Sequence, residues 1–311
     1  VISFFRNFDY KNKNVLIVGG SRGLGLEIAR QMLELKAKII LVARDDQELE
    51  RAKEMLGSEN VFTVVSDISD KTQIENAIST IKSKHGYIDV LINCAGEIKV
   101  GSLDSMTIDD YEYAMKVHYW GPLYSMLAVL PAMRSRKSGR IVNISSIGGK
   151  VSIPHLLPYC ASKHALVGLS DGMRNELLKE NIYITTVCPG LMRTGSHVNA
   201  NFKGHNKIEY AWFTLLNAFP LASVPVQEAA HQIIEACANG QAELIISLPA
   251  QILAKARALF PGELSEVFGF SNRFLPESNN IEAKTGRESQ SVVSPSLLTV
   301  LADKAVIPNN E

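Results

Sequence analysis

Residues 15–25 read Val15-Leu16-Ile17-Val18-Gly19-Gly20-Ser21-Arg22-Gly23-Leu24-Gly25, and a helical pattern follows at once. The short apolar run, rich in β-branched residues, predicts a buried strand. Gly19 permits a tight turn out of that strand, while Gly23 and Gly25 allow close approach of a ligand and close packing of the helix. Free backbone N–H groups and the positive helix end favour a pyrophosphate. This segment therefore predicts a dinucleotide-binding turn between a first strand and a first helix.

The same alternation of strand and helix patterns continues along the chain. Short apolar runs lie at 15–18, 39–42, 61–65, 90–92, 141–144 and 184–187, and helical patterns lie near 23–36, 45–57, 70–85, 107–134 and 159–180. A further helix at 226–238 and a strand at 243–247 complete the series. Continuous apolar strands alternating with helices indicate a parallel sheet covered on both faces. The prediction is an α/β, doubly wound parallel-sheet Rossmann fold in a single domain with a C-terminal extension.

The overall composition excludes several classes of protein. The chain has 311 residues, 46% of them hydrophobic, and 32 basic residues balance 32 acidic ones. Zero net charge without a basic cluster argues against nucleic acid as a partner. No apolar run approaches the roughly 20 residues of a membrane-spanning helix, so we expect no integral membrane segment. Residues 1–10 also lack the pattern of a secretory signal, and we expect Phe4, Phe5 and Phe8 to pack on the domain surface.

The cysteines are few and widely spaced. Cys94, Cys160, Cys188 and Cys237 form no C-x-x-C pair, which predicts free thiols in a reducing compartment and a cytoplasmic location. No cluster of His, Cys and Asp suggests a metal, so none is expected.

Two regions depart from the alternating pattern. Residues 191–224 are expected to be irregular, and their aromatic and aliphatic side chains either line an apolar substrate pocket or pack against the domain or a second subunit. After Pro276 the chain turns polar, and we expect a tail at 276–311 that is poorly ordered or docks through one short helix near 297–301. The amphipathic stretch 248–260 suits a packing or dimer helix more than a peripheral membrane contact.

The end of the second predicted strand indicates which dinucleotide fits. A carboxylate usually stands there to bind the ribose hydroxyls of NAD, but this chain has Ala43 followed by Arg44. Arg22 lies inside the glycine loop, and two guanidinium groups suit the 2′-phosphate of NADP(H). Two alternatives remain: Asp45 turns inward after a one-residue shift, or both arginines are solvated surface charges.

A second set of residues carries a pattern typical of acid–base chemistry. Tyr159 and Lys163 are four positions apart and share one face of a predicted helix. A nearby ammonium group favours the phenolate and brings the phenol toward a useful pKa range. Ser146, at the end of the strand 141–144, precedes Tyr159 by 13 positions.

Taken in order along residues 14–195, these motifs resemble the short-chain dehydrogenase/reductase family. The glycine spacing is G-x-x-x-G-x-G, with Val18 where the family usually has Thr, and Asn93-Cys94-Ala95-Gly96 resembles its N-N-A-G turn. The glycine loop, Ala43-Arg44 and this turn are also shared with 3-ketosphinganine reductases within the family. The resemblance implies that a catalytic domain spans residues 1–275, with 191–225 as its substrate side. It implies the cofactor-binding residues Gly19, Ser21, Arg22, Gly23, Leu24, Gly25, Arg44, Asp67, Ile68, Asn93, Ala95, Gly96, Tyr159, Lys163, Pro189, Gly190 and Thr194.

The resemblance also implies a mechanism. Ser146 would hold the oxygen of a small-molecule substrate, Tyr159 would donate the proton, and Lys163 would bind the nicotinamide ribose and lower the Tyr159 pKa. His118 stands where the family commonly has Asn in a proton relay, so it is either a relay member or a packed core histidine. Members usually form dimers or tetramers through the two long helices at 107–134 and 159–180. A cofactor-sensing regulatory protein with little turnover is the alternative to an oxidoreductase, because fold alone does not fix function.

Overall fold

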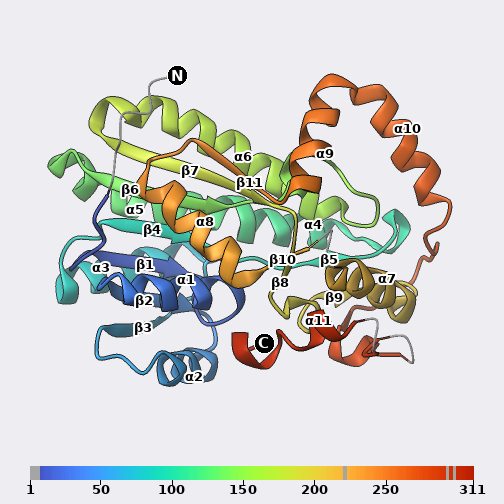
Figure 1. Ribbon diagram of the computed structural model, residues 1–311, viewed down its shortest axis with the longest axis horizontal. Helices are drawn as coiled ribbons and strands as arrows, with labels where there is room; N and C mark the ends of the chain where they lie inside the picture. The colour runs from blue at the N-terminus through green and yellow to red at the C-terminus, as the bar shows by residue number, and fades with distance from the viewer. Residues whose placement is uncertain (1–7, 220–222, 292–293, 297–298) are drawn as a thin grey trace.

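The computed structural model describes residues 8–219, 223–291, 294–296 and 299–311 (Figure 1). Its centre is a seven-stranded sheet in the order β11-β7-β6-β4-β1-β2-β3, in which all neighbouring strands run parallel. The strands are β1 (Asn14–Val18), β2 (Lys38–Ala43), β3 (Val61–Val65), β4 (Val90–Asn93), β6 (Gly139–Ile144), β7 (Ile182–Pro189) and β11 (Glu243–Ile246). The order reverses between β2 and β4 around β1, which creates a crevice at the carboxyl ends of these strands. The predicted doubly wound Rossmann fold is confirmed.

Helices cover both faces of the sheet (Figure 1). One layer consists of α1 (Gly23–Glu34), α2 (Asp46–Leu56) and α8 (Val226–Ala238), and the other of α3 (Lys71–His85), α5 (Gly121–Arg136) and α6 (Leu157–Leu177). Because strand side chains alternate between faces, Val15 and Ile17 of β1 pack into the first layer and Leu16 and Val18 into the second. This two-sided burial explains why the strands read as unbroken apolar runs.

The long helix expected at 107–134 is interrupted. It consists of α4 (Ile108–Met115), a π-helical turn at Lys116–Trp120, and α5. The turn carries His118, which is fully buried. Such turns inside helices are often found at functional sites.

The expectation of an irregular segment at 191–224 was wrong for most of its described residues. A 13-residue helix, α7 (Asn206–Ala218), fills its centre, between β8 (Leu191–Arg193) and β10 (Ser223–Pro225). Tyr210 and Phe213 on α7 are buried against Phe202 of β9 (Asn201–Phe202). The helix forms because its aromatic side chains recur on one face and find a small apolar core of their own.

The tail is more ordered than its polar composition suggested. β12 (Lys284–Thr285) pairs with β9, which in turn pairs with β5 (Lys99–Val100), and α11 (Val300–Asp303) packs on α7. Of the two expectations for 276–311, poor order does not fit the described residues, whereas docking through a short helix fits α11, which packs on α7. Leu297 and Leu298 lie outside the described residues. Polar side chains hold it in place, as where Asp303 Oδ1 lies 3.1 Å from His197 Nε2. Short 3₁₀ turns lie at Leu103–Ser105, Ile147–Gly149, Leu178–Glu180, Ser196–Val198, Arg287–Ser289 and Ile307–Asn309.

Two helices project from the edge of the sheet beyond β11, namely α9 (Leu248–Leu259) and α10 (Pro261–Asn272) (Figure 1). They contact each other, but Ala250 is their one buried residue among those described. No helix within the described residues has both the length and the apolar character needed to cross a bilayer. At the other end of the chain, Phe8 packs beneath the Arg140 guanidinium, whereas Phe4 and Phe5 lie outside the described residues.

Candidate active site

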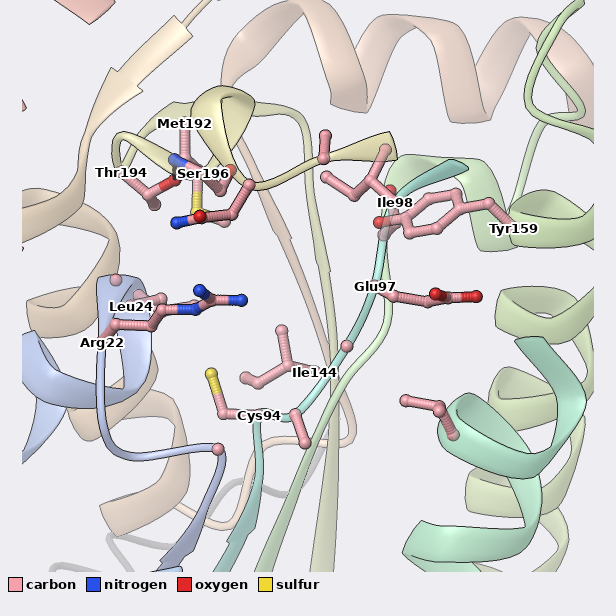
Figure 2. A pocket seen from close by; sticks show the side chains of 18 of the residues that line it. Arg22, Leu24, Cys94, Glu97, Ile98, Ile144, Tyr159, Met192, Thr194 and Ser196 are labelled. Carbon is pink, nitrogen blue, oxygen red and sulfur yellow. Dashed lines mark hydrogen bonds between the residues drawn. The ribbon is translucent and has the colours of Figure 1, made fainter. Parts of the chain in front are cut away.

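A cavity of about 350 Å³ lies at the carboxyl edge of the sheet, where the strand order reverses. Arg22 and Tyr159 point into it from opposite sides (Figure 2). The crevice at this switch point is where parallel α/β sheets bind their ligands. Of the residues expected at the site, sixteen line it, namely Gly19, Ser21, Arg22, Gly23, Leu24, Arg44, Asp67, Ile68, Ala95, Gly96, Ser146, Tyr159, Lys163, Pro189, Gly190 and Thr194.

Three expected residues lie behind the cavity wall. Gly25 packs α1 onto the loop, since a Cβ there would lie 2.1 Å from the Gly19 carbonyl oxygen. Asn93 is buried and donates to Asn143 Oδ1 at 2.8 Å. His118 lies behind Gly96, where an added Cβ would come within 3.3 Å of the imidazole.

The glycine loop has the geometry that a phosphate requires. Gly19 and Gly23 adopt positive φ values of 84° and 56°, and a side chain at Gly19 would collide with the Ala95 backbone. Among the described residues, no side chain caps the N-terminus of α1 and no acidic residue lies in its first turn. The helix end therefore presents backbone N–H groups and positive charge to the cavity, which fits a pyrophosphate group.

The end of the cavity formed by the glycine loop and the start of α2 combines arginines with a carboxylate. Arg22 Nη1 lies 3.2 Å from Glu48 Oε1, and Ser21 Oγ donates to Glu48 Oε2 at 3.1 Å. Arg44 is exposed and donates from Nη1 to the Tyr113 hydroxyl at 2.8 Å. Asp45 caps α2 by accepting the Glu48 N–H at 2.8 Å, so its carboxylate is engaged there.

The opposite end brings Ser146, Tyr159 and Lys163 together. Ser146 follows β6, and its Oγ accepts the Gly148 N–H at 3.0 Å, which fixes the hydroxyl oxygen. Tyr159 and Lys163 lie one turn apart on α6, with Lys163 Nζ 5.6 Å from the centre of the phenol ring. Lys163 Nζ also donates to the Ile144 carbonyl at 2.8 Å, so the lysine spans from α6 to the end of β6.

Burial dominates the ionisation of this pair. It raises the pKa of Tyr159 to about 12, although the hydrogen bond with the Ser146 hydroxyl acts in the opposite direction. It lowers the pKa of Lys163 to about 8, because an ammonium group loses water there. The expectation that Lys163 lowers the Tyr159 pKa was therefore wrong for the direction of the shift, because burial raises this pKa.

His118 connects the Gly96 loop to α6. Its Nε2 accepts the Glu97 N–H at 3.0 Å, so the proton of the neutral ring resides on Nδ1, which lies 2.8 Å from Ser162 Oγ. Burial and the nearby Lys163 charge hold the His118 pKa well below its usual range. Of the two roles considered for His118, this geometry favours the packed core histidine.

Three carboxylates at the cavity escaped the sequence analysis: Glu48, Glu97 and Glu311. Glu97 directly follows the Asn93–Gly96 turn, so its position could have been noticed, and burial raises its pKa. Glu48 lies in the first turn of α2, close after Arg44. Glu311 is far from every motif in the sequence, and no local signal indicates its place. The described residues contain no group of three or more His, Cys, Asp or Glu side chains able to hold a metal ion.

Comparisons with known proteins agree with this geometry. A family model described as short chain dehydrogenase matches residues 13–203. Dehydrogenase/reductase SDR family member 7B of Danio rerio is 36% identical over 203 residues, which cover 63% of this chain and 66% of that protein. A 3-dehydrosphinganine reductase of Danio rerio is 34% identical over 183 residues, or 57% of this chain and 55% of that protein. A solved short-chain dehydrogenase from Streptomyces avermitilis superposes with a TM-score of 0.72 at 27% identity, covering 85% of this chain and all of that one.

Proposed function

The chain is a member of the short-chain dehydrogenase family, and we propose that it is an oxidoreductase that interconverts a carbonyl compound and a secondary alcohol with NADP(H). The observation that carries this proposal is the convergence of Ser146, Tyr159 and Lys163 at one end of a cavity whose other end is the glycine loop. The same arrangement brings an acid–base group within the reach of a substrate bound beside a nicotinamide.

Different cavity residues would bind different parts of the cofactor. The N–H groups at the start of α1 would hold the pyrophosphate, Asp67 and Ile68 would contact the adenine, and Lys163 would bind the nicotinamide ribose. When bound, the nicotinamide supplies or accepts the hydride. Thr194 lines the cavity after β7, and its Oγ1 is fixed by a 2.9 Å hydrogen bond to Ser196 Oγ.

The chain's own residues handle the substrate oxygen and its proton. The Ser146 hydroxyl, oriented by the Gly148 N–H, would hold the carbonyl oxygen. With a pKa of about 12, the Tyr159 phenol keeps its proton at neutral pH and donates it to the developing alkoxide during reduction. In the reverse direction the phenolate accepts the alcohol proton, and the Lys163 ammonium stabilises that phenolate.

The preference for NADP(H) rests on Arg22 and Arg44. Both line the cavity, and guanidinium groups pair well with a 2′-phosphate. The position of Asp45 supports the same preference, because its carboxylate accepts the Glu48 N–H and caps α2. Glu48 argues against a preference for NADP(H), because its carboxylate neutralises part of the Arg22 charge.

An apolar substrate, such as a lipid-like ketone, a steroid or a long-chain 3-keto compound, fits the other walls of the cavity. Ile98, Ile153, Leu156 and Phe213 line it near Tyr159. Phe213 also belongs to a buried cluster with Val100 and Cys160, so residues of the 191–224 segment both line the cavity and pack on the rest of the domain. One relative is named a 3-dehydrosphinganine reductase, which agrees with a long-chain carbonyl substrate.

The proposal also covers the oligomeric state and the cellular location of the enzyme. We propose a small-molecule substrate and a homodimer or homotetramer, and exposed Trp120 and Leu127 at the α5 face suit subunit contacts. The four free thiols support a cytoplasmic location. The exposed Ile252, Phe260 and Phe270 on α9 and α10 suit a second interface or a peripheral membrane contact.

The competing function is a cofactor sensor with little turnover, and one experiment separates the two. The protein is mixed with NADPH and a panel of lipid-like, steroid and long-chain 3-keto ketones, and the cofactor absorbance is followed. We expect oxidation of NADPH with at least one ketone and none with Tyr159→Phe. Tight NADPH binding without oxidation across the panel would overturn the enzyme proposal.

A further inference from the structure

A carboxylate side chain, that of Glu311, lies inside the proposed cofactor site. The Glu311 side chain is 4% exposed and lines the cavity beside the N-terminus of α1. A Cβ added to Gly23 would lie 2.8 Å from Glu311 Oε1, so the carboxylate occupies the space that the glycine leaves open. Its Oε2 accepts a hydrogen bond from Asn199 Nδ2 at 2.7 Å and lies 3.6 Å from Arg22 Nε.

The preceding residues hold this carboxylate in place. We call residues 299–311 the C-terminal strap, which ends close to α1 and α2 in Figure 1. Asn310 Nδ2 donates to the carbonyl oxygens of Ser21 and Glu48 at 2.8 and 3.0 Å. Asn310 Oδ1 accepts from Arg51 Nε at 3.1 Å. The strap is therefore tied to the glycine loop and to α2, the two elements that frame the phosphate end of the cavity.

The surroundings of Glu311 are those of an anion site. A buried carboxylate is unfavourable unless positive charge and hydrogen-bond donors compensate it. Here the uncapped start of α1, the Arg22 guanidinium and the Asn199 amide provide that compensation. Burial still raises the pKa of Glu311, so the compensation is incomplete. The same groups would stabilise the two negative charges of a pyrophosphate.

We propose that the C-terminal strap is an internal ligand of the pyrophosphate subsite, and that Glu311 must leave Gly23 and Arg22 before a nicotinamide dinucleotide binds. The inference rests on the proposed function, because it takes that subsite as the place of the cofactor's phosphates. Two anions cannot share one helix end without repulsion, so the strapped state disfavours cofactor and bound cofactor disfavours the strap. The strap thereby sets the concentration of cofactor at which the enzyme becomes occupied.

The test measures cofactor affinity and strap mobility in the full chain. Glu311→Gln removes the charge with little change in shape, and Asn310→Ala releases the strap while leaving the carboxylate intact. Glu282→Gln is the matched control, because Glu282 is an exposed tail carboxylate away from the cavity. NADPH is titrated by calorimetry, and hydrogen exchange of residues 306–311 is followed with and without NADPH.

We expect Glu311→Gln and Asn310→Ala to lower the NADPH dissociation constant by about 3- to 10-fold, the range of a charge at a partly buried helix end. The control is expected to match wild type. NADPH is expected to speed hydrogen exchange in residues 306–311 of the wild type, because the bound cofactor displaces the strap.

Three outcomes would overturn the inference alone. Weaker NADPH binding by Glu311→Gln would mean that the carboxylate supports the bound cofactor. Slower exchange of residues 306–311 with NADPH would mean that the strap closes over it. Equal affinities of wild type and both variants would leave the proposed function standing and remove the inference alone. Absence of dinucleotide binding by every variant would instead remove the proposed function, and the inference with it.

Discussion

At the proposed catalytic end of the cavity, Ser146, Tyr159 and Lys163 come from two segments, the end of β6 and the first turns of α6. At the phosphate end, Arg22 of the glycine loop meets Glu48 of α2 and Glu311 from the end of the chain. The first group is fixed by hydrogen bonds to nearby backbone, such as Lys163 Nζ to Ile144 O. The second group consists of charged side chains that form ion pairs with one another. We propose that a bound ligand would have to break some of these ion pairs.

This difference bears on how each end works. A preorganised catalytic end stabilises the transition state without reorganising during the reaction. At the proposed phosphate end the charges are already paired, so we expect a ligand to bind there by exchanging partners and its affinity to depend on the internal carboxylates as well as on the arginines. Substitutions at the first end should therefore change turnover, and substitutions at the second should change cofactor binding.

The largest expected effect comes from Tyr159 at the catalytic end. Tyr159→Phe removes the proton donor and is expected to lower kcat by about 10²- to 10⁴-fold, the usual contribution of a general acid. Tyr113→Phe is the matched control, since it removes the hydroxyl that accepts from Arg44 and should leave kcat unchanged. Steady-state kinetics with a ketone found in the panel would measure both. Equal losses in the two variants would contradict the division between the ends.

The second effect concerns the arginines of the phosphate end. Arg44→Ala and Arg22→Ala are each expected to reduce the preference for NADPH over NADH by about 10- to 100-fold, since a charge-assisted hydrogen bond contributes about 1.5–3 kcal/mol. The ratio of the two dissociation constants measures it. Arg134→Ala, which removes a surface arginine paired with Glu180, should leave the ratio as in wild type. An unchanged ratio in Arg22→Ala and Arg44→Ala would refute the role of these arginines, and a wild-type ratio that favours NADH would refute the NADP(H) preference itself.

The contrast between the ends also explains what the sequence could predict. Gly19, Ser146, Tyr159 and Lys163 stand at fixed spacings within a strand–helix rhythm, and local geometry follows from local spacing. The pairing of Glu311 with Arg22 follows from how a polar tail folds back, which no local pattern encodes. The fold was predictable because strands buried on both faces of the sheet appear in the sequence as unbroken apolar runs. The helix α7 was not predicted because its aromatic residues pack in a small cluster separate from the main core.

The third prediction concerns the pH dependence of folding stability that results from the burial of Lys163. Burial lowers the Lys163 pKa from 10.5 to about 8, so between these pH values the unfolded chain binds more protons and folding stability rises with pH. Lys163→Met removes this dependence. We expect wild type to gain about 1–3 kcal/mol of unfolding free energy relative to the variant from pH 7 to 10.5, measured by urea unfolding without cofactor.

Lys150 provides a control, because its pKa is shifted in the direction opposite to that of Lys163. Burial alone would lower its pKa, but the hydrogen bond and ion pair with Glu243 raise the pKa overall. Its stabilising contribution is therefore present below the unfolded pKa and is lost as the pH rises through the folded pKa. Lys150→Met should make the stability of the protein less sensitive to alkaline pH, and parallel changes in the two variants would contradict a specific burial effect at Lys163.

The smallest effect is expected at His118, because we propose that its imidazole supports the catalytic end by packing and takes no part in proton transfer. Both ring nitrogens are engaged, by the Glu97 N–H and by Ser162, and the Ser162 hydroxyl donates to the Tyr159 carbonyl. His118→Asn should therefore retain kcat within about tenfold, since one ordinary hydrogen bond is worth about 1 kcal/mol. A total loss of turnover with an unchanged melting temperature and NADPH affinity would make His118 a relay group, and the catalytic end would then extend through the buried π-helical turn.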